Sequence, residues 1–180
     1  MLANSAELAA VLAEGDRLGA VFARHAYGMR RWVDLFSARV AGIEDPQAKE
    51  LVAALVADNA RHMNLFRERA RAHRVDPDAY RAPTEGEAIY KRLDELEAFD
   101  EVAAFALGSL DHFAELLEVY AESAQDGDLA VIATVRADVD RMRGQLRSTV
   151  ARGDEEAADE AHALYRRREL VETPRYALAG

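Results

Sequence analysis

Apolar residues recur every three or four positions over long stretches of the chain, which is the spacing of amphipathic helices. Capping residues, Pro and Gly divide this pattern into segments. Asp45-Pro46, Thr84 with Glu87, and Asp126-Gly127-Asp128 each begin a new helix, whereas Thr173-Pro174 ends the last one. The predicted helices cover residues 4–40 with a bend near Gly15 and Gly19, 46–71, 84–96, 101–123, 126–152 and 154–171.

Four of the predicted helices are long, and a link that contains the short helix joins the second long helix to the third. Each long helix carries one apolar stripe, as near-antiparallel bundle packing requires. The pattern therefore predicts an all-α bundle. Polar side chains interrupt the apolar stripes at His25, Asn59, His62, Ser109 and His112.

A weak internal repeat relates the two halves of the chain. Ala57-Asp58-x-x-Arg61 recurs 80 residues further on as Ala137-Asp138-x-x-Arg141, and Ala26-x-Gly28 recurs at the same offset as Ala106-x-Gly108. Two interpretations of the Asp and Arg pairs are open: ion pairs across the bundle, or pairs within each helix at i and i+3. The intrahelical interpretation is favoured.

Two helical hairpins joined by a long crossover are the plan of the ferritin-like bundle. The sequence resembles the ferritin-like superfamily from about residue 16 to 152, in its helix lengths, in the Asp45-Pro46 restart and in the segment 56–66. The resemblance implies a ferritin-like four-helix up-down bundle with a long crossover, a short crossover helix and a C-terminal fifth helix. This implies one domain over residues 1–172, followed by a tail over 173–180.

The metal ligands of the ferritin-like family are largely missing from the matching positions. The family's Glu-x-x-His motif is Asn59-x-x-His62 in the second helix. In the fourth it falls on Val139-x-x-Met142 or, one register later, on Asp140-x-x-Arg143. The third helix has Phe105 and no acid at the corresponding level, and His25 is the one plausible ligand in the first. The resemblance therefore implies the fold without the usual di-iron centre.

Three interpretations of the central polar residues are open. They are hydrogen-bonded core groups that fix the helix register, or a metal site, or a pocket for a small molecule. A metal site for iron or manganese would use His25, His62, Asp58 and Asp138. No metal is favoured over the alternatives. A ligand pocket would be lined by His25, Asn59, His62, Phe105 and Met142.

Length, charge and composition narrow the function further. The 180 residues suit one domain, and the absence of Cys excludes disulfides, zinc–thiolate sites and cysteine nucleophiles. A net charge of −10 argues against a nucleic-acid partner. No leader peptide or long apolar run is present, so we expect a soluble cytoplasmic protein with no membrane partner. Arg166-Arg167-Arg168 is interpreted as the solvated positive end of the last helix.

The expected function is that of a binding, structural or accessory protein, with a small molecule as its possible ligand. The alternative is a metal-dependent oxidase or oxygenase with a non-standard His and Asp site, so whether the chain is an enzyme stays open. The resemblance also implies a homodimer. Of the 23 basic residues only Lys49 and Lys91 are lysines, which together with abundant Ala is typical of a GC-rich bacterial genome.

Overall fold

The computed structural model describes residues 5–150 and 155–178, and these ranges contain helices and no strand. The all-α prediction is therefore confirmed. The helices are α1 (Ser5–Ala13), α2 (Leu18–Val40), α3 (Pro46–Ala72), α4 (Thr84–Glu95), α5 (Phe99–Ser123), α6 (Asp126–Thr149) and α7 (Glu155–Ala177).

The start of α3 follows local chemistry that the sequence displays, whereas the N-cap residues of α4 and α6, which are Pro83 and Gln125, make no side-chain capping hydrogen bond. The side chain of Asp45 accepts a hydrogen bond of 2.7 Å from the Ala48 backbone N–H, and Pro46 occupies the first turn of α3. The bend expected near Gly15 is a full break, because α1 ends at Ala13 and α2 begins at Leu18. The break predicted at Gly153-Asp154 lies outside the described residues.

The end of α7 differs from the prediction. Thr173-Pro174 does not terminate the helix, which continues to Ala177 with Pro174 inside it. Proline removes one backbone hydrogen bond and costs roughly 3 kcal/mol in a helix interior. Glu172, Thr173 and Tyr176 are all at most 2% exposed, so their packing outweighs this local cost.

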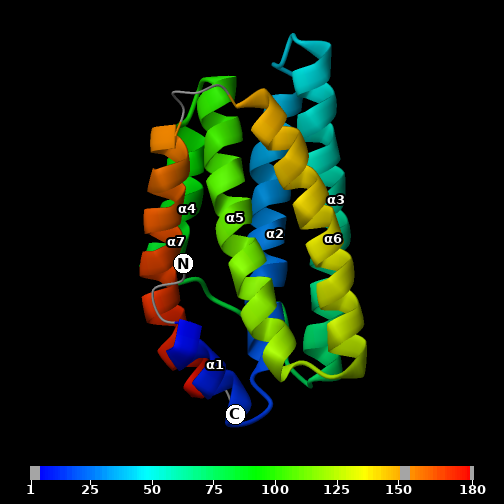
Figure 1. Cartoon of the computed structure of the whole chain (residues 1–180), viewed down its shortest axis with the longest axis vertical. Helices are drawn as coiled ribbons and strands as arrows, with labels where there is room; N and C mark the ends of the chain where they lie inside the picture. The colour runs from blue at the N-terminus through cyan, green and yellow to red at the C-terminus, as the bar shows by residue number, and fades with distance from the viewer. Residues whose placement is uncertain (1–4, 151–154, 179–180) are drawn as a thin grey trace.

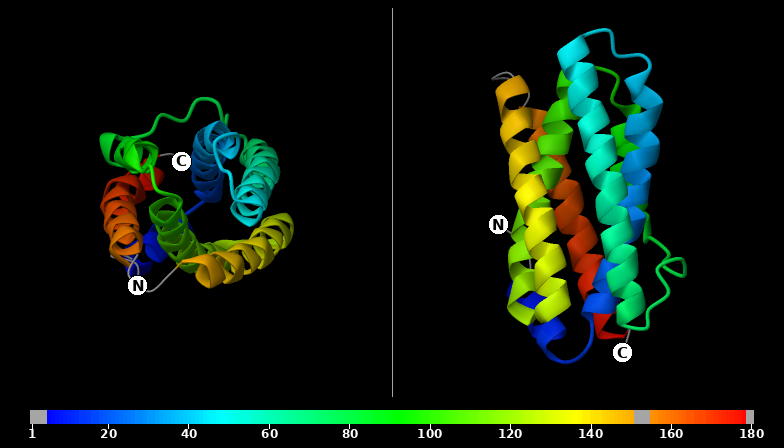
Figure 2. Two further views of the ribbon diagram at one scale, coloured as in Figure 1. Left: turned by 90° about the horizontal axis from the view of Figure 1, so that it is seen from above. Right: turned by 90° about the vertical axis from the view of Figure 1, so that its right-hand side faces the viewer.

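Six of the helices form a closed ring when the molecule is viewed from its end (Figure 2). Their closely packed neighbours follow the order α2, α3, α6, α5, α7, α4 and back to α2, while α1 packs against α5 and α7 (Figure 1). Among the described helices, α2 and α5 are not a closely packed pair. Side chains of both helices, including His25 and Phe113, fill the space between them.

Two glycines of the internal repeat lie where the added helices α4 and α7 approach the bundle. A Cβ atom at Gly28 would lie 2.9 Å from the hydroxyl of Tyr90 on α4. A Cβ atom at Gly108 would lie closer than 3.0 Å to the backbone of Ala158 on α7. The absence of a side chain at Gly28 thus allows α4 to pack closely against α2, and its absence at Gly108 allows α7 to pack closely against α5.

The core contains apolar side chains from all seven helices, with Phe22, Phe36, Phe66, Phe105 and Leu116 among the most completely buried. In the described part of the chain, no helix is both long enough and apolar enough to cross a membrane.

Candidate functional site

A cluster of charged side chains lies inside the ring, where α2 and α7 face each other. Arg24 is 2% exposed and Glu169 is 0% exposed, and Nη1 of Arg24 lies 3.0 Å from Oε1 of Glu169. The guanidinium of Arg168, also buried, reaches the same oxygen at 3.3 Å. Burial alone would raise the pKa of Glu169, but Arg24, then His112 and Arg168, more than offset it and lower the pKa to about 2. The carboxylate is therefore ionised.

His25 and Tyr120 extend this cluster toward α5. Nη2 of Arg24 lies 2.6 Å from Nε2 of His25 and 3.0 Å from the hydroxyl of Tyr120. An arginine only donates hydrogen bonds, so Nε2 of His25 accepts and the ring proton sits on Nδ1. Burial, and then the charge of Arg24, hold the pKa of His25 well below 6.5. His25 is therefore a neutral imidazole.

Three further residues, which are Glu172 and Arg175 of α7 and His112 of α5, extend the cluster. Glu172, which is 1% exposed, accepts a hydrogen bond from the hydroxyl of Tyr80 and lies 3.5 Å from Nη1 of Arg175. His112 lies 3.7 Å from Oε1 of Glu169. Its pKa is lowered by burial, which Glu169 only partly offsets.

A cavity of about 40 Å³ adjoins the cluster. A water molecule needs roughly 10–15 Å³ of such space, so the cavity accommodates roughly three to four groups of that size. Its polar lining comes from Arg24, His25, Asn59, Ser109 and Arg168. Its other walls are Gly28, Met29, Trp32, Tyr90, Leu110, Phe113 and Tyr165.

Two buried donors of this lining are unsatisfied. Nε of Arg24 and Nε of Arg168 each lack a hydrogen-bond acceptor among the described residues. Burying an unpaired donor costs roughly 1–3 kcal/mol. Such groups are rare in folded proteins and call for an explanation in terms of function, water or an ion.

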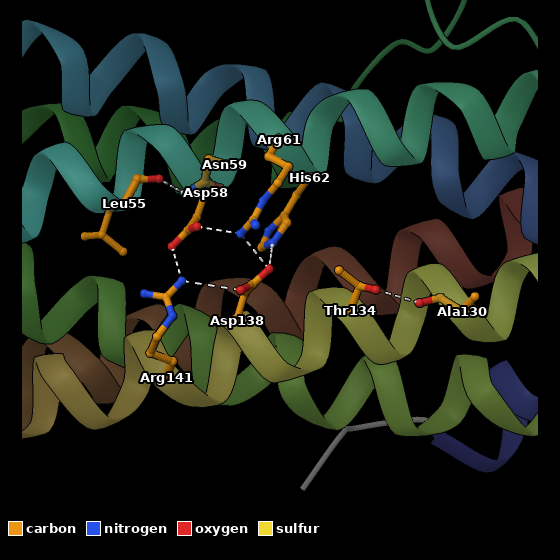
Figure 3. A network of polar contacts seen from close by, with 9 residues as sticks. All are labelled: Leu55, Asp58, Asn59, Arg61, His62, Ala130, Thr134, Asp138 and Arg141. Carbon is orange, nitrogen blue, oxygen red and sulfur yellow. Dashed lines mark hydrogen bonds and ion pairs between the residues drawn. The ribbon is translucent and has the colours of Figure 1, made fainter.

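The two Asp and Arg pairs of the internal repeat form a ring of ion pairs between α3 and α6 (Figure 3). Arg61 lies 2.6 Å from Asp58 in its own helix and 2.7 Å from Asp138 in the other. Arg141 lies 2.6 Å from Asp58 and 3.4 Å from Asp138. The intrahelical and the cross-bundle interpretations are therefore both realised, because each arginine binds both carboxylates.

His62 contacts the ring of ion pairs between α3 and α6 and does not line the cavity. It is 1% exposed, and its Nε2 lies 3.0 Å from Oδ2 of Asp138 (Figure 3). Burial lowers the pKa of His62, and the hydrogen bond to Asp138 offsets only part of this shift. Asn59, one turn away, donates a 2.8 Å hydrogen bond to the Leu55 carbonyl and lines the cavity.

The structure thus separates the residues that the sequence grouped into one pocket. His25 and Asn59 line the cavity together. His62 faces Asp138, whereas Phe105 and Met142 are buried in the apolar core and are not part of the cavity lining.

The residues considered for a metal are also distributed over two places. His25 is bonded to Arg24 and Tyr120, whereas Asp58 and Asp138 are engaged by arginines at the seam between α3 and α6. Over residues 5–150 and 155–178, no group of three or more His, Asp or Glu side chains is arranged to hold a metal ion.

Sequence reasoning missed the charged residues that α7 contributes. Arg168 was interpreted as solvated, and this interpretation is wrong because the side chain is buried. A signal was present: Ala161, Tyr165, Arg168, Glu172 and Tyr176 repeat at intervals of three and four. This spacing is typical of a buried helix face, but Arg168 and Glu172 are charged, so an apolar pattern does not reveal the face.

Comparisons of the chain with protein-family models, with curated proteins and with solved structures gave no match.

Proposed function

We propose that this chain is a ferritin-like helical bundle without the usual di-iron centre, which binds a small molecule in the cavity between its helices. The observation that carries the proposal is the pair of buried arginines lining that cavity. Each has an Nε–H donor without an acceptor among the described residues. A bound ligand would supply the acceptors and remove the cost of burying these donors.

The construction of the cavity supports a binding role. Apolar and aromatic walls with a few convergent polar groups are typical of small-molecule sites. A core that served stability alone would gain from apolar side chains of similar volume, since buried ion pairs often contribute nothing net. Here, Arg24 and Arg168 line the wall of an open space.

The ferritin-like assignment has separate support. The hairpins α2–α3 and α5–α6 are joined by a crossover that contains α4, as the resemblance implies. Asn59 stands where the family has the glutamate of Glu-x-x-His, and it faces the cavity. We propose that a ligand pocket occupies the space in which the family holds metal.

A screen of small molecules against a cavity-filling variant tests the binding role. Ser109 lines the cavity and donates a 2.8 Å hydrogen bond to the Phe105 carbonyl within its own helix. Ser109→Leu adds carbon to the cavity and loses only that bond. The matched control is Thr134→Leu, because Thr134 is exposed and makes the same type of bond, 2.9 Å long, to Ala130 (Figure 3).

We expect compounds of about three to four non-hydrogen atoms, sized to the cavity, to raise the melting temperature of the wild type and of Thr134→Leu. Ser109→Leu should lose this response. A library in which no compound stabilises the wild type would overturn the proposal. So would a ligand that stabilises Ser109→Leu and the wild type equally, because it would bind elsewhere.

A further inference from the structure

We infer that the ligand of the cavity is a small monocarboxylate with one or two carbon atoms, an inference that rests on the proposed function. Three properties of the lining lead to it: the excess of hydrogen-bond donors, the local balance of charge, and the size and polarity of the space.

The polar lining offers mainly donors. Arg24 and Arg168 have only N–H groups, and each has a free Nε–H among the described residues. His25 accepts at Nε2 from Arg24, which leaves its proton on Nδ1. The hydroxyl proton of Ser109 is already bonded to the Phe105 carbonyl. A ligand that matches this lining must be rich in acceptors and poor in donors.

The charges around the cavity leave one positive charge in excess. The cluster contains the three guanidinium groups of Arg24, Arg168 and Arg175 and the two carboxylates of Glu169 and Glu172. Arg24 and Arg168 line the cavity, whereas neither of these carboxylates nor any other acidic side chain of the described residues does so. Three positive against two negative charges leave a balance of +1, which one monoanion neutralises.

The rest of the lining distinguishes a carboxylate from an inorganic anion. The lining also contains the apolar side chains of Met29, Trp32, Leu110 and Phe113. A guanidinium binds a planar carboxylate through parallel hydrogen bonds, while an alkyl group would lie on these apolar side chains. About 40 Å³ holds roughly three to four groups of the size of water, which suits formate and sets an upper limit near acetate.

The test compares matched ligands by isothermal titration calorimetry at pH 7. Formate and acetate are titrated beside the neutral isosteres formamide and acetamide, and beside chloride and nitrate. Ligands this small have limited binding energy, so we expect dissociation constants no tighter than about 10 µM. The carboxylates should bind at least tenfold more tightly than the amides and the inorganic anions.

Variants of α7 locate the binding. Arg168→Met keeps an extended side chain over Tyr165, where the guanidinium carbon lies 4.4 Å from the ring centroid. It leaves the ion pair between Arg24 and Glu169 in place. We expect at least a tenfold loss of carboxylate affinity. The matched control, Arg167→Met on the exposed face of the same helix, should bind like the wild type. Circular dichroism of Arg168→Met verifies that the variant is folded.

The outcomes separate this inference from the proposed function. Acetamide binding as tightly as acetate would overturn the carboxylate while leaving a small-molecule cavity intact. Nitrate binding as tightly as acetate would also overturn it, because the apolar side chains of the lining would then have no role. Carboxylate binding that survives in Arg168→Met would place the ligand elsewhere and overturn it too. If neither these compounds nor the wider library bind, the proposed function itself fails.

Discussion

The ion pair between Arg24 and Glu169 makes the most direct prediction about stability. Glu169→Gln keeps the shape of the side chain and removes its charge, so the buried guanidinium groups of Arg24 and Arg168 lose their common counter-ion. Removing one partner of a buried ion pair typically costs about 3–5 kcal/mol. The pKa of Glu169 gives a similar figure, because a shift from 4.5 to about 2 corresponds to about 3 kcal/mol. We expect a loss of about 3 kcal/mol in the free energy of unfolding.

Urea unfolding followed by circular dichroism at pH 7 measures this loss. The matched control is Glu160→Gln in the same helix. Glu160 is 38% exposed and pairs with Arg92 at 2.9 Å, an exposed arrangement that is worth about 0–1 kcal/mol. A loss below about 1 kcal/mol in Glu169→Gln, or a loss equal to that of the control, would refute the reasoning, because the pair would then behave as a surface contact.

The contribution of the Arg24–Glu169 ion pair to the free energy of unfolding should depend on pH in the acidic range. The pKa of Glu169 is lower in the folded chain than in the unfolded chain, so its contribution is complete above pH 4.5 and disappears as the pH falls toward 2. The difference between the wild type and Glu169→Gln should therefore shrink over this interval. A difference that stays constant down to pH 3 would show that the glutamine variant fails through packing and not through lost charge.

Three further predictions address packing, the ring of ion pairs and pH. Gly108→Ala should destabilise the fold by about 1–3 kcal/mol in urea unfolding, because the new methyl group overlaps Ala158. Gly144→Ala, with open space around it, should stabilise by about 0.5–1 kcal/mol, and equal effects would contradict the close approach of α7. Asp138→Asn should lower the free energy of unfolding by about 1–2 kcal/mol. This loss should be smaller in 1 M than in 0.05 M NaCl, because salt screens the ion pairs of Asp138. A loss that does not depend on salt would argue against an electrostatic role. Stability should fall as the pH drops below 6.5, by up to about 1.4 kcal/mol per pH unit for each histidine that burial keeps neutral, and a flat profile from pH 7.5 to 5.5 would contradict the low pKa values of His25, His62 and His112.

The features that could be predicted from the sequence are those decided by neighbours along the chain. The start of α3 follows from Asp45 and Pro46, whose cap and fixed backbone angle act within one turn. The stripe residues Phe22, Phe66 and Leu116 are buried because their periodicity places them on one face of each helix. The repeated Asp and Arg pairs do form ion pairs, but the sequence favoured only the pairs within each helix and not those between α3 and α6.

The features that escaped prediction depend on residues that are distant in the sequence. Glu169 and Arg168 have the composition of a solvated helix, and only the presence of Arg24 and His112 explains their burial. Pro174 normally ends a helix, and only the packing of Tyr176 explains why α7 continues. Phe105 and His62 were expected in the ligand pocket, but Phe105 is buried in the apolar core and His62 faces Asp138, contacts that depend on the packing of helices distant in the sequence. The ferritin-like resemblance itself remains a prediction.

The distance along the chain between Arg24 and Glu169 has a consequence for biosynthesis. The two residues are 145 positions apart. At a synthesis rate of 5–20 residues per second, the carboxylate is made about 7–30 seconds after the guanidinium. Until then, α2 and α5 cannot close over Arg24 without burying a charge that has no counter-ion. The nascent chain must therefore keep the surroundings of Arg24 hydrated until α7 has been synthesised and docks.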